Sequence, residues 1–186
     1  MRTLTIDFII SLDGYAAAEG WPGFWGMEGP EYLAWLADQP EHALLMGATT
    51  YRLMSGFAAA GEDDPLAATP KYVFSSTLRE PLAWPNTTLV TGDAVAAVRA
   101  LKEQDGPPLS TLGSLSLCRA LLDAGLVDRF RVVIFPVITG LTGRERIFDG
   151  YPDLLLDLVQ SRTFDAGIQL LEYVPRPVEA PPGPAA

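Results

Sequence analysis

Three short segments of the chain combine a glycine or serine turn with hydroxyl side chains, a combination suited to phosphate binding. They are MGATTY at 46–51, FSST at 74–77 and TLGSLS at 111–116. A turn that leads into a helix leaves backbone N–H groups unpaired at the positive end of the helix dipole, where an anion satisfies them. Each turn alone is explained more simply as a helix start capped by its own serine or threonine. None matches the G-x-G-x-x-G or Walker A spacing.

Energetics decides how many such turns a cofactor requires. One helix end contributes roughly 0.3–1 kcal/mol, or about 2 kcal/mol when partly buried. Micromolar binding needs about 8 kcal/mol. A dinucleotide therefore requires several of these turns to converge.

Acidic and aromatic side chains supply the candidates for acting on a substrate. Asp13, in SLDGY, is either an acid beside a reacting ring or part of an Asp-Gly turn. Glu31 and Tyr32 lie in PEYLAWL, where the Tyr32 hydroxyl either donates a proton or points towards water. Trp25 and its aromatic neighbours either stack on a flat heterocycle or pack within their loop. Asp13, Glu31 and Tyr32 are thus the catalytic candidates.

Composition and charge exclude several other classes of function. The net charge is −10 and no cluster of Lys and Arg occurs, which argues against nucleic acid and anionic membranes as partners. The single histidine, His42, argues against a histidine-based metal site. Cys118 is the only cysteine, which suits a reducing cytoplasm, and its apolar helical context indicates core packing. We find no signal-peptide pattern and no apolar run of membrane-spanning length.

Strand-like and helix-like segments alternate along most of the chain, which predicts an α/β fold with a mostly parallel sheet. Two alternating segments near the end, LDLVQSRTF and GIQLLEYV, predict an antiparallel hairpin. Ligands of such sheets bind beyond the carboxyl ends of the strands, where the three turns are placed. We expect one domain over residues 1–174 and a disordered Pro/Ala-rich tail over 175–186. The expected strands are 2–11, 42–47, 71–76, 87–92, 109–113 and 129–138, and the expected helices are 30–38, 48–57, 93–104 and 114–124.

The order of several motifs resembles the dihydrofolate reductase superfamily. The motifs are SLDGY, LLMGATTY, KYVFSSTL, TLGSLSLCRALLDAGLVDRFRVVIFPVITG and GIQLLEYV. The chain looks most like the branch that contains the reductase domain of the bifunctional riboflavin-biosynthesis deaminase/reductase and its stand-alone relatives. The resemblance implies a three-layer α/β/α dihydrofolate-reductase-like fold, a homodimer, and NADPH as hydride donor to a small heterocycle.

The resemblance also implies roles for individual residues. Gly47, Ala48, Thr49 and Thr50 would meet the cofactor phosphates, Ser75, Ser76 and Thr77 the adenosine ribose phosphate, and Gly113, Ser114, Leu115 and Ser116 the pyrophosphate. Asp13, Trp25 and Leu112 would lie beside the substrate.

The chain departs from these relatives at several of the matching positions. The family commonly carries an arginine at the position of Ala48, so NADH is a possible cofactor as well as NADPH. Ser114 replaces the second glycine of a pair, Tyr32 replaces the acid of dihydrofolate reductases, and Leu112 replaces a glutamate of the riboflavin-pathway reductase. Besides a reductase resembling 5-amino-6-(5-phosphoribosylamino)uracil reductase, the alternatives are a dihydrofolate or pterin reductase, a non-catalytic dimeric nucleotide-binding protein, and a flavodoxin-type module.

Overall fold

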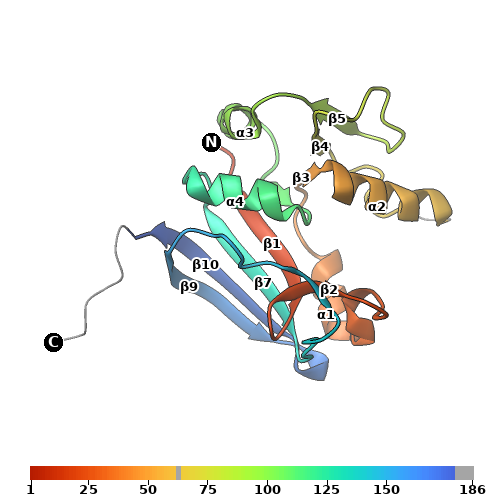
Figure 1. Cartoon of the computed structure of the whole chain (residues 1–186), viewed down its shortest axis with the longest axis vertical. Helices are drawn as coiled ribbons and strands as arrows, with labels where there is room; N and C mark the ends of the chain where they lie inside the picture. Colours follow the sequence, from red (N-terminus) through yellow and green to blue (C-terminus); the bar gives the residue numbers. More distant parts are fainter. Residues whose placement is uncertain (62–63, 179–186) are drawn as a thin grey trace.

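Eight strands form one mixed sheet, which confirms the predicted α/β class. A computed structural model describes residues 1–61 and 64–178. The strand order is β5-β4-β3-β6-β1-β7-β10-β9 (Figure 1). β10 runs antiparallel to both of its neighbours, β7 and β9, and the other neighbouring pairs are parallel. The strands are β1 (Leu4–Ser11), β3 (Ala43–Gly47), β4 (Lys71–Phe74), β5 (Thr87–Val90), β6 (Leu109–Thr111), β7 (Arg129–Phe135), β9 (Leu154–Thr163) and β10 (Gln169–Pro177).

Among the described residues, four α-helices cover the two faces of the sheet. They are α1 (Pro30–Ala37), α2 (Ala48–Ala60), α3 (Ala94–Glu103) and α4 (Leu115–Asp123). Successive residues of β3 show which helix lies on which face, because side chains alternate along a strand. Leu45 packs in a cluster with residues of α3 and α4, whereas Met46 packs with Tyr51 of α2. The three layers implied by the resemblance are therefore present.

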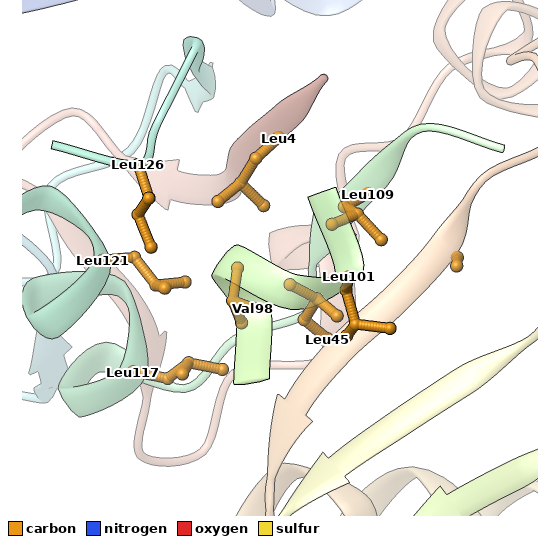
Figure 2. Close-up of a cluster of buried hydrophobic side chains, with 9 residues drawn as sticks. Leu4, Leu45, Val98, Leu101, Leu109, Leu117, Leu121 and Leu126 are labelled. Atoms are coloured by element: carbon orange, nitrogen blue, oxygen red, sulfur yellow. The ribbon is translucent and has the colours of Figure 1, made fainter. Parts of the chain in front are cut away.

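A leucine-rich cluster holds α3 and α4 against the centre of the sheet. Figure 2 shows side chains from the strands and from both helices converging in this layer. Full burial of one such side chain contributes roughly 1.5–3 kcal/mol relative to exposure. The cluster therefore fixes where α4 begins relative to β3 and β6. Its labelled members are Leu4, Leu45, Val98, Leu101, Leu109, Leu117, Leu121 and Leu126.

A second, two-stranded sheet was not predicted. It pairs β2 (Tyr15–Ala18) with β8 (Gly143–Arg146), and both lie in segments where no strand or helix was expected. The alanines of β2 and the charges of β8 give no apolar alternation, so the sequence contains little strand signal there. The pairing depends on Gly143, since a Cβ atom there would lie 2.7 Å from the Tyr15 ring.

The two ends of the C-terminal region also differ from expectation. β7 ends at Phe135 rather than at residue 138, because Pro136 has no N–H group to continue the ladder. β10 continues to Pro177, past the expected start of the tail at residue 175. Residues 179–186 of that tail lie outside the described residues. Within the described part of the chain, no helix is long and apolar enough to cross a membrane.

Candidate functional site

The three predicted phosphate-binding turns follow neighbouring strands. The sheet order places β4, β3 and β6 side by side. Gly47, at the end of β3, pairs with Phe74 at the end of β4, and Thr111 at the end of β6 pairs with Leu45 of β3. Because these strands are parallel, the loops that follow them leave the same edge of the sheet.

Two of these turns are in direct contact. The Gly47 amide donates a 2.6 Å hydrogen bond to Ser114 Oγ, which lies 3.1 Å from Thr50 Oγ1. Gly113 also faces Thr50, since a Cβ atom on Gly113 would lie 2.9 Å from Thr50 Oγ1. Consecutive left-handed residues, with φ of 58° at Gly113 and 66° at Ser114, turn the chain into α4. The structure thus brings the starts of α2 and α4 together.

These two helix starts differ from those of α1 and α3 in their capping. In α3, the Asp93 carboxylate caps the helix by accepting hydrogen bonds from the Val95 and Ala96 amides at 2.9 and 3.2 Å. In α1, the Asp165 carboxylate accepts from the amides of Glu31 and Tyr32.

The capping residues of α2 and α4 are Gly47 and Ser114, and neither makes a side-chain capping bond to its own helix. Ala48 and Thr49 lie in the first turn of α2, and Leu115 and Ser116 in that of α4. The uncapped amides of these two turns are therefore the natural partners for an anion.

The third turn uses one of its hydroxyls locally. Ser75 Oγ accepts hydrogen bonds from the amides of Thr77 and Leu78, both at 3.1 Å, and so closes a serine turn. The side chains of Ser76 and Thr77 are exposed beside it. A role for Ser75, Ser76 and Thr77 in binding a ribose phosphate stays a prediction.

Asp13 joins the loop after β1 to the loop after β7. Its carboxylate accepts hydrogen bonds from Ser11 Oγ at 2.6 Å, from the Gly140 amide at 2.9 Å and from the Thr139 amide at 3.2 Å. Partial desolvation raises the pKa of Asp13, but these hydrogen bonds outweigh it and hold the pKa below its ordinary value. Asp13 is therefore ionised near neutral pH, and its catalytic role stays a prediction.

Tyr32 does not point towards water. Its side chain is fully buried, and its ring packs within 5.6 Å, centroid to centroid, of Phe135 and Phe164. The expectation that the Tyr32 hydroxyl points towards water is wrong, because the side of α1 that carries Tyr32 packs against an aromatic cluster. Burial raises the pKa of Tyr32, and no partner for its hydroxyl occurs among the described residues.

The three remaining candidates on the substrate side lie at different places in the structure. They are Glu31, Trp25 and Leu112. The Glu31 carboxylate accepts from the Asp165 amide at 3.1 Å, so it helps to hold α1 against the β9–β10 turn. Trp25 is 5% exposed and packs in the same aromatic cluster as Tyr32. Leu112 lies beside the turn at Gly113 and Ser114, where its carbonyl accepts from Ser114 Oγ at 3.3 Å. Substrate contacts by Trp25 and Leu112 stay predictions.

The residues that sequence reasoning missed act through long-range contacts. Thr139 and Gly140, which hold Asp13, were visible only as part of the segment PVITG. Asp165, which caps α1, was only part of the hairpin turn. Neither the segment PVITG nor the hairpin turn indicates which distant residue it contacts. Within residues 1–61 and 64–178, no group of three or more His, Cys, Asp or Glu side chains is arranged to hold a metal ion.

The mixed sheet, with helices on both faces and two helix starts in contact beyond its strands, defines a three-layer α/β protein with a dihydrofolate-reductase-like fold. The chain belongs to the RibD C-terminal domain family, whose profile matches residues 2–170.

Several individual proteins are similar to this chain. It is 26% identical to the uncharacterized protein YyaP of Bacillus subtilis over 92% of this chain and 94% of that protein. A putative riboflavin biosynthesis protein from Shewanella has a solved structure that superposes with a TM-score of 0.72 at 21% identity, covering 94% and 99% of the two chains. The Thermotoga maritima diaminohydroxyphosphoribosylaminopyrimidine deaminase/5-amino-6-(5-phosphoribosylamino)uracil reductase gives 0.64 at 18% identity, covering 94% of this chain and 57% of that one.

Proposed function

We propose that this protein is an NADPH-dependent reductase of a small, flat heterocycle, with a reaction like that of 5-amino-6-(5-phosphoribosylamino)uracil reductase. NADH is the alternative hydride donor, because no arginine stands at position 48. Membership of the RibD C-terminal domain family supports the reductase class. A cytoplasmic location remains a prediction from the lone cysteine.

One observation carries the proposal: the two helix starts that meet at the sheet edge are the two without side-chain caps. α1 and α3 have their amides satisfied by carboxylates, which would repel a phosphate. α2 and α4 instead expose amides from opposite layers towards one place. Hydrogen bonds to charged groups contribute roughly 1.5–3 kcal/mol each, so a few amides from both helices suffice for micromolar binding.

The residues present fit a pyrophosphate-containing nucleotide. Gly113 keeps the close approach to Thr50 free of a Cβ atom, and glycine adopts its left-handed φ of 58° without steric cost. Thr50 and Ser114 add hydroxyls at the same point. When bound, the nicotinamide nucleotide would supply a hydride to the substrate.

Asp13 is the candidate group for the substrate side. It follows β1, which lies beside β6 in the sheet, so its loop leaves the same edge as the cofactor turns. Its hydrogen bonds to Ser11, Thr139 and Gly140 hold the carboxylate ionised and oriented. An oriented carboxylate can accept a hydrogen bond from an amino or ring N–H group of a heterocycle.

Cofactor titration with a matched pair of glycine variants tests the site. G113A adds a methyl group that meets Thr50 at 2.9 Å, whereas G125A, also at positive φ, meets nothing within 4 Å. Both variants place an alanine at a positive φ, and only G113A puts its methyl group against the proposed phosphate-binding turns. We expect nucleotide fluorescence titration to show at least a tenfold loss of affinity in G113A and little change in G125A. Wild-type protein that binds neither NADPH nor NADH at millimolar concentration would refute the proposal.

A non-catalytic nucleotide-binding protein is the second candidate. It is favoured by the burial of Tyr32 and by the use of Glu31 in holding α1. The two candidates differ in turnover. Oxidation of NADPH in the presence of any aminopyrimidine, pterin or related imine would exclude the non-catalytic one.

A further inference from the structure

The hydroxyl of Ser114 lies at the point where β3 and β6 stop pairing. In this parallel ladder the Ala43 amide donates to the Pro108 carbonyl at 2.8 Å. The same interval along both strands would next join the Gly47 amide to the Leu112 carbonyl. Ser114 Oγ lies between these two groups instead, since it accepts from the Gly47 amide at 2.6 Å and donates to the Leu112 carbonyl at 3.3 Å. The hydroxyl is therefore inserted into the ladder as a spacer.

All the hydrogen-bonding positions of this hydroxyl are used inside the protein. A serine hydroxyl has one proton to donate and two lone pairs that accept. The proton goes to the Leu112 carbonyl, and one lone pair receives the Gly47 amide. The second lone pair is available to the hydroxyl of Thr50, whose Oγ1 lies 3.1 Å away. Ser114 Oγ can therefore bind a phosphate only if one of these bonds breaks.

The backbone that carries Ser114 is held by α4. Cys118 is fully buried, its amide donates to the Ser114 carbonyl at 3.0 Å, and its Sγ donates weakly to the Gly113 carbonyl at 3.4 Å. Leu117 and Leu121 of the same helix pack in the leucine-rich cluster. The Ser114 hydroxyl thus reaches the start of α2 from a firmly packed base.

Ser114 also adopts a backbone conformation that serine seldom takes. Its φ of 66° and ψ of 61° are left-handed, a region that costs a non-glycine residue free energy. A glycine at position 114 would avoid this cost, but it would have no hydroxyl. The bonds of Oγ to Gly47, Thr50 and Leu112 are what the serine adds in return. A left-handed serine between two helix starts therefore points to a functional constraint.

We propose, as a step that rests on the proposed function, that Ser114 is a positioning residue of the nucleotide site. Its side chain sets the separation between the starts of α2 and α4 without itself contacting the nucleotide. The amides of Ala48 and Thr49 on α2 must reach the same pyrophosphate as those of Leu115 and Ser116 on α4. Because the spacer fixes this separation before the ligand arrives, the free energy of ordering the two helix starts is not subtracted from binding.

Two other roles for the same side chain lead to different results. If the Ser114 side chain crowds the phosphate, its removal strengthens nucleotide binding. If the hydroxyl donates to the phosphate, its bond to the Leu112 carbonyl must break in the complex. As a spacer, the hydroxyl is required for tight binding and keeps its bonds to Gly47 and Leu112 when the nucleotide is bound.

Substitution by alanine and by glycine tests the spacer. Both S114A and S114G remove the hydroxyl, but only S114A keeps a non-glycine residue at the left-handed φ. S114G should therefore be the more stable of the two in thermal denaturation without ligand. We expect both to weaken NADPH binding by about five- to tenfold in fluorescence titration, the effect of one lost hydrogen bond. A similar loss of affinity at unequal stability separates positioning from a general effect on folding.

S55A is the matched control. Ser55 also lies in α2, and its hydroxyl donates to the Arg52 carbonyl at 3.4 Å, away from the start of the helix. This variant should bind NADPH as wild type does. A crystal structure of the wild-type NADPH complex completes the test, and in it Ser114 Oγ should still accept from the Gly47 amide and donate to the Leu112 carbonyl.

Three results would overturn the role of Ser114 and leave the proposed function intact. They are wild-type affinity in both S114A and S114G, tighter NADPH binding in either variant, and a complex in which Ser114 Oγ has left Gly47 for a phosphate oxygen. Wild-type protein that binds neither NADPH nor NADH is a different outcome, because it removes the proposed function and the role of Ser114 together.

Discussion

Asp13 illustrates how one carboxylate can hold two loops together. It accepts hydrogen bonds from Ser11 and from the amides of Thr139 and Gly140, which lie 126 and 127 positions away in the sequence. The pKa of Asp13 is lowered in the folded protein, so its stabilising contribution is present above the unfolded pKa of about 3.9. That contribution is lost as pH falls through the lower folded pKa.

We therefore predict a pH-dependent difference between wild type and D13N. The free energy of unfolding, from urea denaturation, should be lower in D13N above about pH 5, and the gap should narrow as pH falls below about 4. The reason is that wild-type Asp13 becomes neutral there, as the asparagine always is. A gap that is constant from pH 7 to pH 3 would contradict the hydrogen-bond account of this residue.

The sequence predicts contacts between residues that are close together in the chain, but it does not predict the long-range contacts of the site. The Asp93 cap was predictable because its partners lie two and three residues away. The bond from Gly47 to Ser114 spans 67 residues and depends on the packing of α4 against the sheet. The sequence could name Ser114 as a departure from its relatives, but only the fold shows its hydroxyl facing the start of α2.

At the scale of elements, the start of α1 depends on a carboxylate from another part of the chain. Asp165 accepts from the amides of Glu31 and Tyr32 at 3.1 and 3.4 Å. Gly29 allows this approach, because a Cβ atom there would lie 2.1 Å from Asp165 Oδ2. The cap fixes α1 against the turn between β9 and β10.

We predict that D165A lowers the free energy of unfolding by about 1 kcal/mol, the usual loss when a helix cap is removed. D165N is the matched control, because its single amide oxygen can still accept from one of the two helix amides, and its stability should fall between those of D165A and wild type. Urea denaturation of the three proteins measures the differences. If D165A and D165N unfold at the same urea concentration as wild type, the cap contributes nothing.

Most elements were predictable because their apolar periodicity matches their burial. α3 buries Val98 and Leu101 on one side, and β1 buries alternate residues from Leu4 to Ile10. β2 and β8 were missed because alanines and arginines carry no such periodicity, and their pairing arises from the loops that bring them together. Tertiary context, rather than local preference, creates these two strands.

At the scale of the whole molecule, the candidate cofactor site joins the two outer layers. α2 packs on one face of the sheet and α4 on the other, and their starts meet at Ser114. A ligand that bridges both starts would stabilise the assembly of both layers onto the sheet. Binding to the folded chain alone then raises its stability in proportion to the logarithm of ligand concentration.

We predict that NADPH raises the melting temperature of the protein. At about 100 times the dissociation constant the stabilisation is about 2.7 kcal/mol, which corresponds to roughly 5–10 °C for a chain of this size. Differential scanning fluorimetry should show the same NADPH-dependent rise in melting temperature in G125A and a much smaller rise in G113A. The reason is that Gly113 lies where the starts of α2 and α4 meet, and Gly125 does not. Equal increments in the two glycine variants would place the nucleotide elsewhere on the molecule.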